Sequence, residues 1–468
     1  MLPEQFIRDL GEIPHSSDAA ALRVKSADFS WFSPIMSAAL AGRLAELLVA
    51  PRSEEEVVRV AAACARHRVP LVARGAGTGN FGQAVPLAGG AVVEMLGLDR
   101  IVWQRGGAVR AQAGTRLGAL DERLREGGRE LRMHPSTKRL ATLGGFVGGG
   151  HAGIGAVNWG ILRDRGNLLG LRVVTIEETP RILELRGDDV NLVHHAYGVN
   201  GLLTEVELPL APAYEWLDTI VVFDDFARAA EFGLALATQD GLLKKLVSVH
   251  AWPIPGYFKL LQPYLPPGKA AALLMIGAET REACEALVRE FCGEITLCVP
   301  EAGLETPGGK GTPLYEFTWG HTTMHALRAD RSLTYLVCIF PREDTLGAIR
   351  RVHAKLGAEA FLHLEYKRFN GYLTAEGVPL FRYHGFEQMT RLYRAFEAEG
   401  VRVANAHTFL LQNGGMKDLD GAQIEFKRTV DPHLLMNPGK IAGLDDLPGG
   451  VSGAALEAAQ LPASGWAY

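Results

Sequence analysis

Glycine is concentrated in one window of the chain, where the backbone could bind an anion. Of the 54 glycines in the 468 residues, 23 lie between Gly75 and Gly170. The densest loop, at 74–82, reads RGAGTGNFG. Successive amides in such a loop can converge on an anion, and each charge-assisted hydrogen bond contributes about 1.5–3 kcal/mol. The window therefore predicts a binding site for a pyrophosphate group.

The same loop matches the dinucleotide-binding pattern GxGxxG at Gly77, Gly79 and Gly82. That pattern requires a helix to begin at the glycines, so that the helix N-terminus faces the pyrophosphate. The residues that follow contain Pro86 and then two glycines, which is a poor helix sequence. We therefore expect the loop to bind pyrophosphate through its own amides and not as part of a Rossmann unit.

A segment rich in charged and aromatic residues in the second half of the chain could supply acid–base groups. If it forms a strand, alternation places His363, Glu365 and Lys367 on one face and Tyr366 with Arg368 on the other. Histidine and tyrosine can transfer a proton, and arginine can pair with a carboxylate through two hydrogen bonds. A solvated charged face opposite a core-facing tyrosine explains the same pattern equally well.

Two other histidines are candidates for chemistry. His407 lies among small and apolar neighbours, where a proton acceptor could be partly desolvated. A buried histidine with satisfied hydrogen bonds is the alternative. His321 lies close to Trp319 in the sequence, and together they could form an aromatic wall with an edge that binds a carboxylate. A scaffold role for this segment fits at least as well.

These candidates lie far apart along the chain, so regular elements must bring them together. Ser53 and Glu56 match a capping box at the start of a helix. Apolar strands are expected at 69–73 and 91–96, on either side of the glycine loop. Beyond Ala213 glycine becomes rarer, and strands alternate with amphipathic helices. The sequence therefore predicts helices and strands in at least two domains.

Composition and charge exclude several classes of protein. The chain has 48 Lys and Arg against 53 Asp and Glu, a formal net charge of -5, so no overall field attracts nucleic acid. No apolar run approaches the roughly 20 residues that a membrane span needs. Five cysteines without a CxxC motif, and a start without a signal region, favour a reducing compartment. We expect a cytoplasmic protein without a nucleic-acid partner or a membrane span.

Four motifs in a fixed order carry a family resemblance. They are RGAGTG at 74–79, PS at 135–136 leading to ATLGG at 141–145, GLLTE at 201–205 and NPGK at 437–440. Together they resemble the vanillyl-alcohol-oxidase/p-cresol-methylhydroxylase (PCMH) type of FAD-binding family, particularly its glycolate-oxidase and D-lactate-dehydrogenase-like branch. The resemblance covers about residues 45–212 and the C-terminal segment.

The resemblance implies FAD as the cofactor and a role for each motif. The first loop would wrap the FAD pyrophosphate, and the turn at Gly144 and Gly145 would pass the ribityl chain and the isoalloxazine ring. The strand at 202–206 would line the adenine end. Relatives that attach flavin covalently often have histidine where this chain has Thr78, so we expect noncovalent FAD.

The C-terminal motif belongs to the same implied site. Asn437 and Lys440 could hydrogen-bond the flavin edge where negative charge accumulates on reduction, although a plain turn also explains the motif. The cofactor-binding residues that the resemblance implies are Arg74, Gly75, Ala76, Gly77, Thr78, Gly79, Asn80, Pro135, Ser136, Thr142, Gly144, Gly145, Gly148, Gly149, Leu203, Asn437 and Lys440.

The chain departs from the metal-using branch of the family. That branch has a His-x-Gly-x-Gly-Asn-like segment in its cap, whereas this chain has NAHTF at 405–409. A divalent metal held by His363, Glu365 and His407 is chemically allowed, but without the motif we expect none. The same departure weakens the transfer of specificity for glycolate, D-lactate or 2-hydroxyglutarate.

The resemblance implies an α+β fold. A two-part FAD-binding domain of PCMH type would precede an α+β substrate (cap) domain, and a C-terminal segment would return to the flavin. The expected boundaries are 1–44 for an N-terminal extension, 45–212 for the FAD-binding domain, 213–400 for the cap, 401–445 for the returning segment and 446–468 for a tail.

The implied activity is the oxidation of a small hydroxy acid or alcohol by hydride transfer to flavin N5. The candidate catalytic residues are His407, Tyr366, Arg368, His321 and His363. The partners would be this hydroxy substrate and an electron acceptor, which could be oxygen, a quinone or a carrier protein. Two alternatives stay open: a flavin-dependent transferase like alkylglycerone-phosphate synthase, and a noncatalytic subunit of an oxidase complex.

Overall fold

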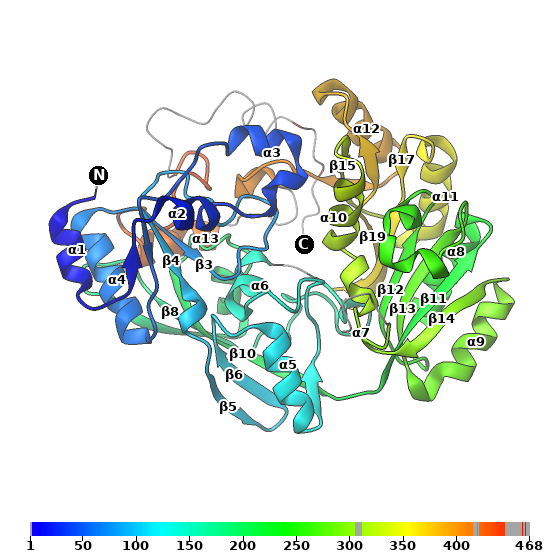
Figure 1. Cartoon of the computed structure of the whole chain (residues 1–468), viewed down its shortest axis with the longest axis horizontal. Helices are drawn as coiled ribbons and strands as arrows, with labels where there is room; N and C mark the ends of the chain where they lie inside the picture. Colours follow the sequence, from blue (N-terminus) through cyan, green and yellow to red (C-terminus); the bar gives the residue numbers. More distant parts are fainter. Residues whose placement is uncertain are drawn as a thin grey trace.

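The computed structural model describes residues 2–150, 152–304, 311–414, 419, 421–444, 461 and 464. Helices pack on several sheets, which confirms the predicted α+β class (Figure 1). Within these residues, no helix has both the length and the apolar character needed to cross a membrane. The tail expected at 446–468 lies outside the described residues, except for Leu461 and Ser464.

A small sheet near the N-terminus presents the glycine loop. Its strands, in the order β1-β2-β4-β3, are β1 (His15–Ser16), β2 (Leu47–Val49), β4 (Ala91–Glu94) and β3 (Leu71–Arg74). Strands β2 and β3 both pair with β4 in parallel. Because β3 ends at Arg74, the loop at 74–82 begins at the carboxyl end of a buried parallel strand.

Helix α4 (Glu54–His67) connects β2 to β3 and covers this sheet. Ser53 Oγ accepts a hydrogen bond from the Glu56 amide at 3.3 Å, which confirms the predicted start of the helix. Its buried face carries Val57 and Val60, which belong to the same hydrophobic cluster as the sheet. The other helices on this side of the molecule are α1 (Glu4–Leu10), α2 (Ala19–Lys25) and α3 (Pro34–Ala39).

A second, mainly antiparallel sheet supports the other glycine-rich region. Its strands are β5 (Ile101–Arg105), β6 (Ala108–Gln112), β10 (Leu202–Pro212), β8 (Gly170–Val174) and β9 (Ile182–Arg186), with β7 (Arg129–Leu131) paired to β10. Helices α5 (Leu117–Glu126), α6 (Leu143–Gly149) and α13 (Gly421–Val430) accompany it, whereas α7 (Ala156–Trp159) packs against the eight-stranded sheet described next. Helix α6 lies near the centre of the molecule (Figure 1).

An eight-stranded sheet forms the other side of the molecule. In order, its strands are β14 (Glu294–Pro300), β11 (Trp216–Phe223), β13 (Ala270–Gly277), β12 (Lys244–His250), β18 (His363–Phe369), β19 (Tyr372–Gly377), β16 (Val337–Ile339) and β21 (Arg402–Ala404). A three-stranded sheet contains β15 (Leu333–Tyr335), β20 (Leu380–Arg382) and β17 (Ala360–Phe361).

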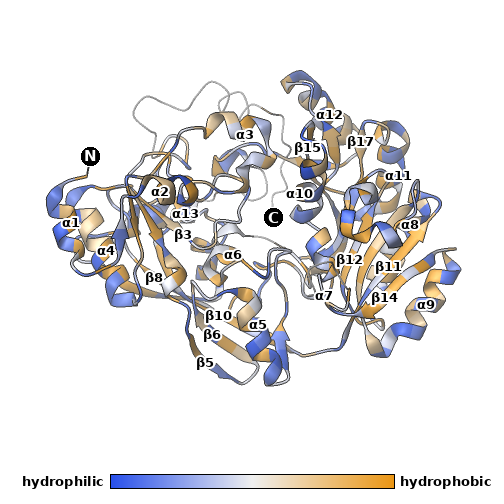
Figure 2. Ribbon diagram, in the orientation of Figure 1, coloured by the Kyte–Doolittle hydropathy of each residue, from blue (hydrophilic) through white to orange (hydrophobic). Residues whose placement is uncertain are grey.

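Helices cover both faces of the eight-stranded sheet. On the outer face lie α8 (Phe226–Thr238), α9 (Arg281–Glu290), α11 (Thr345–Leu356) and α12 (Phe386–Ala398). The inner face packs against α10 (Gly320–Ala329) and against residues from the first half of the chain, including Phe32 and Phe81. Figure 2 shows strands of this sheet as strongly hydrophobic, as expected for a sheet that is buried on both faces.

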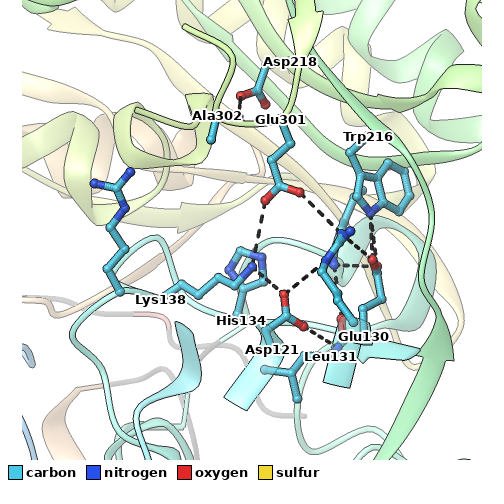
Figure 3. Close-up of polar contacts among 12 residues, drawn as sticks. Asp121, Glu130, Leu131, His134, Lys138, Trp216, Asp218, Glu301 and Ala302 are labelled. Atoms are coloured by element: carbon cyan, nitrogen blue, oxygen red, sulfur yellow. Dashed lines mark hydrogen bonds and ion pairs between the residues drawn. The ribbon is translucent and has the colours of Figure 1, made fainter. Parts of the chain in front are cut away.

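A buried ionic network joins this sheet to the second sheet (Figure 3). Glu130 on β7 accepts hydrogen bonds from Trp216 Nε1 at 3.0 Å and from Lys245 Nζ at 2.6 Å. Nearby, Lys138 Nζ lies 2.6 Å from Asp121 Oδ2. Because Lys138 directly follows the turn at 135–137, the network fixes that turn between the two halves of the molecule.

The pKa of Asp218 on β11 lies well above the usual range of an aspartate. Its Oδ2 accepts hydrogen bonds from the amides of Ala302 and Leu314, at 3.2 and 3.1 Å (Figure 3 draws the first of them). Burial, assisted by the charge of Glu301, raises the pKa of Asp218 to about 7. The folded protein therefore keeps a proton on this carboxyl between about pH 4 and pH 7, where the unfolded chain has lost it.

Asp218→Asn should remove part of the pH dependence of stability. The raised pKa makes the wild-type free energy of unfolding fall as pH rises from about 4 to about 7, by on the order of 3–4 kcal/mol for this group. An asparagine oxygen can accept the same two amides without titrating. Denaturant unfolding should give similar stabilities for the two proteins at pH 5 and a more stable variant at pH 8. A constant difference across this range would contradict the assignment.

Candidate active site

Most of the predicted cofactor residues line one cavity of about 1170 Å³, including its open mouth. The glycine loop forms one wall, and α6 with the turn that precedes it forms another. The predicted residues that line it are Arg74, Gly75, Ala76, Gly77, Thr78, Gly79, Asn80, Pro135, Thr142, Gly144, Gly145, Gly148, Gly149 and Leu203. Segments up to about 130 residues apart are therefore brought together as the motifs implied.

The backbone of this cavity leaves room for a large cofactor. Thr142 caps α6 by accepting a hydrogen bond from the Gly145 amide at 3.3 Å. A Cβ added at Gly148 or Gly149 would meet no protein atom within 4 Å, because this face of the helix opens onto the cavity. Gly77 has a φ of +69°, which a β-branched residue rarely adopts. These features fit FAD, whose long body needs close approach to the backbone.

Arg74 places a positive charge beside the glycine loop. Its Nη1 donates a hydrogen bond to the Ala27 carbonyl at 2.7 Å, and its guanidinium packs over Gly77. Burial lowers the pKa of Arg74, while the carboxylates of Asp28 and Glu94 oppose that shift. A cation in this position suits an anionic pyrophosphate.

Asn437 and Lys440 lie behind the loop instead of in the cavity wall. Lys440 Nζ donates to the Gly82 carbonyl at 2.5 Å. Asn437 Nδ2 donates to the carbonyls of Gln83 and Tyr197, at 2.8 and 2.6 Å. Neither residue lines the first cavity, so the structure gives them a bracing position and not the predicted contact with the flavin edge.

A second cavity of about 800 Å³ adjoins the first. Thr78, Asn80, Pro135 and Thr137 line both, so the two cavities meet along these residues. Ser136, the remaining predicted cofactor residue, lines the second cavity. The second cavity is therefore the place where a substrate could meet the reactive ring of a cofactor held in the first.

His321 is the predicted catalytic residue that the structure brings to this second cavity. It lies at the start of α10, and its Nδ1 is 3.2 Å from Glu316 Oε2. A proton on Nδ1 would leave Nε2 as an acceptor. The neighbouring Trp319 also lines the cavity, as the aromatic-wall interpretation suggested.

His407 lies elsewhere, fully buried in the core. Its Nδ1 is 2.8 Å from Ser33 Oγ and its Nε2 is 2.8 Å from the Tyr335 carbonyl, so both ring nitrogens have protein partners. Burial lowers the pKa of His407 to about 4. The prediction of a catalytic role for this residue is corrected to the alternative, a buried histidine with satisfied hydrogen bonds that supports Tyr335.

The candidates on β18 also lie away from both cavities. The predicted alternation is confirmed, but Tyr366 points to the outer face, where its hydroxyl donates to the Ala230 carbonyl at 2.6 Å. Arg368, on the same face, forms an ion pair with Asp240. His363 is buried on the inner face with its Nε2 2.7 Å from Glu365 Oε1. The outer face meets α8, which is why it cannot line the site.

Glu376 lines the second cavity and was not predicted. It lies on β19, is 5% exposed, and its carboxylate contacts Lys367 on the neighbouring strand. The sequence did carry a signal for Glu376, because it is the one acidic residue in β19, next to small or apolar residues. Tyr335, whose hydroxyl accepts a hydrogen bond from Asn80 Nδ2 at 3.1 Å, was also missed.

The described residues contain no group of three or more His, Cys, Asp or Glu side chains arranged to hold a metal ion. His363 and Glu365 form a buried pair next to His250, with the two histidine rings stacked at 4.5 Å between centroids. His407 belongs to a different part of the core, so the three residues considered as metal ligands are not brought together.

Known proteins resemble the chain most clearly in the first half. Residues 45–184 match the family model of an FAD-binding domain. Glycolate oxidase subunit GlcD of Escherichia coli (strain K12) is 31% identical over 176 residues, which are 36% of this chain and 34% of that protein. D-lactate dehydrogenase of Anaerostipes hadrus is 28% identical over 189 residues, 38% of each. The chain thus aligns with about a third to two fifths of the length of these curated relatives.

The fold extends the likeness over almost the whole chain. A solved structure of alkyldihydroxyacetonephosphate synthase superposes with a TM-score of 0.70, covering 94% of this chain and 86% of that one at 15% identity. A further sequence relative, an FAD-linked oxidoreductase of Mycobacterium tuberculosis (strain ATCC 25618 / H37Rv), is 29% identical over 188 residues, 38% of this chain and 40% of that protein. The chain therefore carries an FAD-binding domain of the PCMH type, and FAD is its cofactor.

Proposed function

We propose that the protein is an FAD-dependent oxidoreductase that oxidises a hydroxyl-bearing small molecule and passes the electrons to a separate acceptor. The junction of the two cavities along Thr78, Asn80, Pro135 and Thr137 carries this proposal. When bound, FAD supplies the acceptor for a hydride from the substrate carbon. The names of the glycolate oxidase and D-lactate dehydrogenase relatives support a hydroxy compound as the substrate class.

In this proposal the protein binds the substrate, excludes water and receives its hydroxyl proton. His321 Nε2 is the proposed proton acceptor, and Glu316 orients the ring through Nδ1 at 3.2 Å. Trp319 and Tyr335 form apolar walls that keep water from the reacting atoms. The hydrogen bond from Asn80 to Tyr335 connects the glycine loop to the wall of the second cavity.

A transferase is the second candidate. The likeness to alkyldihydroxyacetonephosphate synthase covers 94% of this chain, which is more than any of the sequence relatives described above. Such an enzyme would use the flavin without net oxidation. A noncatalytic subunit of an oxidase complex is the third candidate, because the glycolate oxidase relatives are themselves subunits.

Anaerobic mixing of the yellow protein with 2-hydroxy acids, polyols and aromatic alcohols tests these candidates. We expect at least one substrate to bleach the flavin absorbance and to support continued reduction of an electron-acceptor dye. Acid precipitation should leave the flavin in the supernatant, because Thr78 cannot form a histidyl bond. Absence of turnover by the isolated protein, together with copurification of a second chain, would favour the subunit instead.

A further inference from the structure

The second cavity has a mostly apolar and aromatic wall. The side chains that form it include Phe29, Phe32, Phe81, Trp319, Met324 and Val378. They come from the N-terminal segment, the glycine loop, the start of α10 and the residues after β19. The apolar character of the cavity wall therefore does not depend on one element. Such a wall favours a ligand with an apolar or aromatic body, because burial of its surface contributes roughly 25 cal/mol per Å².

Among the described residues, this cavity lacks a strong anion-binding group. Among the described residues that line it, Glu376 is the acid, and there is no lysine or arginine. Lys367 on β18 forms a buried ion pair with the Glu376 carboxylate and offsets its negative charge, but Lys367 does not line the cavity. His321 does line it, but its ring lies 3.2 Å from the Glu316 carboxylate, which offsets any positive charge on the ring. Arg74 lines only the first cavity.

This arrangement is unfavourable for an anion. A carboxylate or phosphate that enters a buried cavity loses its hydration, and proteins normally replace it with Arg or Lys hydrogen bonds. Here no Arg or Lys lines the wall, and the carboxylate of Glu376 already pairs with Lys367 behind it. A neutral hydroxyl group loses far less on burial and can donate a hydrogen bond to the same carboxylate.

We propose that the second cavity selects a neutral alcohol with an apolar or aromatic body, that Glu376 accepts the hydrogen bond of a substrate hydroxyl, and that 2-hydroxy acids bind more weakly. The proposal rests on the oxidoreductase function above and narrows its substrate class. Glu376 acts as a specificity-determining residue, distinct from the proton acceptor His321.

The test compares two ligands with one body and different charge. Mandelate is the acid, and 1-phenyl-1,2-ethanediol replaces its carboxylate with a neutral CH₂OH group; 2-hydroxyoctanoate and 1,2-octanediol form an aliphatic pair. Affinity for the FAD-loaded protein is read anaerobically from the change in flavin absorbance on titration, before any bleaching. We expect each diol to bind about tenfold or more tightly than its acid.

Glu376→Gln supplies the matching change in the protein. It keeps the side-chain shape and removes the negative charge, while Lys367 keeps its positive charge. The preference for the diol should shrink or reverse, chiefly because the acid binds more tightly. Glu359→Gln, which removes one negative charge outside both cavities, should leave the wild-type preference unchanged. FAD content measured by absorbance confirms that each variant is folded and loaded.

The outcomes separate this proposal from the function on which it rests. Equal or tighter binding of the acids by the wild-type protein would overturn the neutral-alcohol proposal, as would failure of both diols to bind. Bleaching by an acid would at the same time support the oxidoreductase function. Tight binding of a diol without any bleaching would uphold the selectivity and count against oxidation.

Discussion

Gly148→Leu should produce a folded protein that binds FAD roughly 5- to 150-fold more weakly than the wild type. The position lies in α6, where leucine is a better helix former than glycine, so the helix itself should be retained. A Cβ here meets no protein atom within 4 Å and projects into the first cavity. Overfilling a packed site costs about 1–3 kcal/mol, which corresponds to this range of affinities.

The measurement is a titration of the flavin-free protein with FAD, together with the FAD-to-protein ratio after purification. Gly421→Leu is the matched control, because Gly421 begins α13, is exposed, and also has no atom within 4 Å of an added Cβ. The control should bind FAD like the wild type. Unchanged affinity in Gly148→Leu would mean that the cofactor does not occupy the first cavity.

His321→Asn should slow substrate-driven flavin reduction by about 100- to 10,000-fold, the usual effect of losing a general base. The flavin should remain bound, because His321 lines only the second cavity. Stopped-flow measurement of flavin bleaching at saturating substrate isolates this step from binding. A rate equal to that of the wild type would move the proton acceptor to another group in the cavity wall.

His407→Asn should affect stability and not the rate of flavin reduction, in contrast to His321→Asn. The variant loses the ring contacts with Ser33 and the Tyr335 carbonyl, so we expect a loss of stability of about 1–3 kcal/mol. The reduction rate per bound flavin should stay at the wild-type value, since His407 lines neither cavity. A large loss of rate in His407→Asn, with none in His321→Asn, would restore His407 as the catalytic candidate.

The sequence predicted which loops line the first cavity, because the information for these loops is local. Gly77 has a positive φ and Gly148 faces the first cavity, which are the features expected where a backbone approaches a ligand closely. The motif order then linked loops that the fold brings together. Asn437 and Lys440 show the limit of this reasoning, since a matched motif did not reveal on which side of the loop its side chains lie.

The substrate side could not be predicted from local pattern alone. Alternation on β18 correctly separated Tyr366 from His363, but the sequence does not say that α8 covers one face and α10 the other. His407 fitted the expectation of a partly desolvated base, but its hydrogen-bond partners Ser33 and Tyr335 lie 374 and 72 residues away in the sequence. No local pattern could identify them. Glu376 became recognisable only once the cavity around it was known.

The buried junction around Glu130 limits how the molecule can move. Glu130 joins β7 to Trp216 and Lys245, which are 86 and 115 residues further along the chain. Removing one partner of such a buried pair costs about 3–5 kcal/mol, because the other charge stays buried without compensation, so these contacts oppose separation of the two sheets. We therefore expect substrate and product to enter and leave through local motions of side chains and loops at the cavity mouth, with little opening between β7 and the eight-stranded sheet.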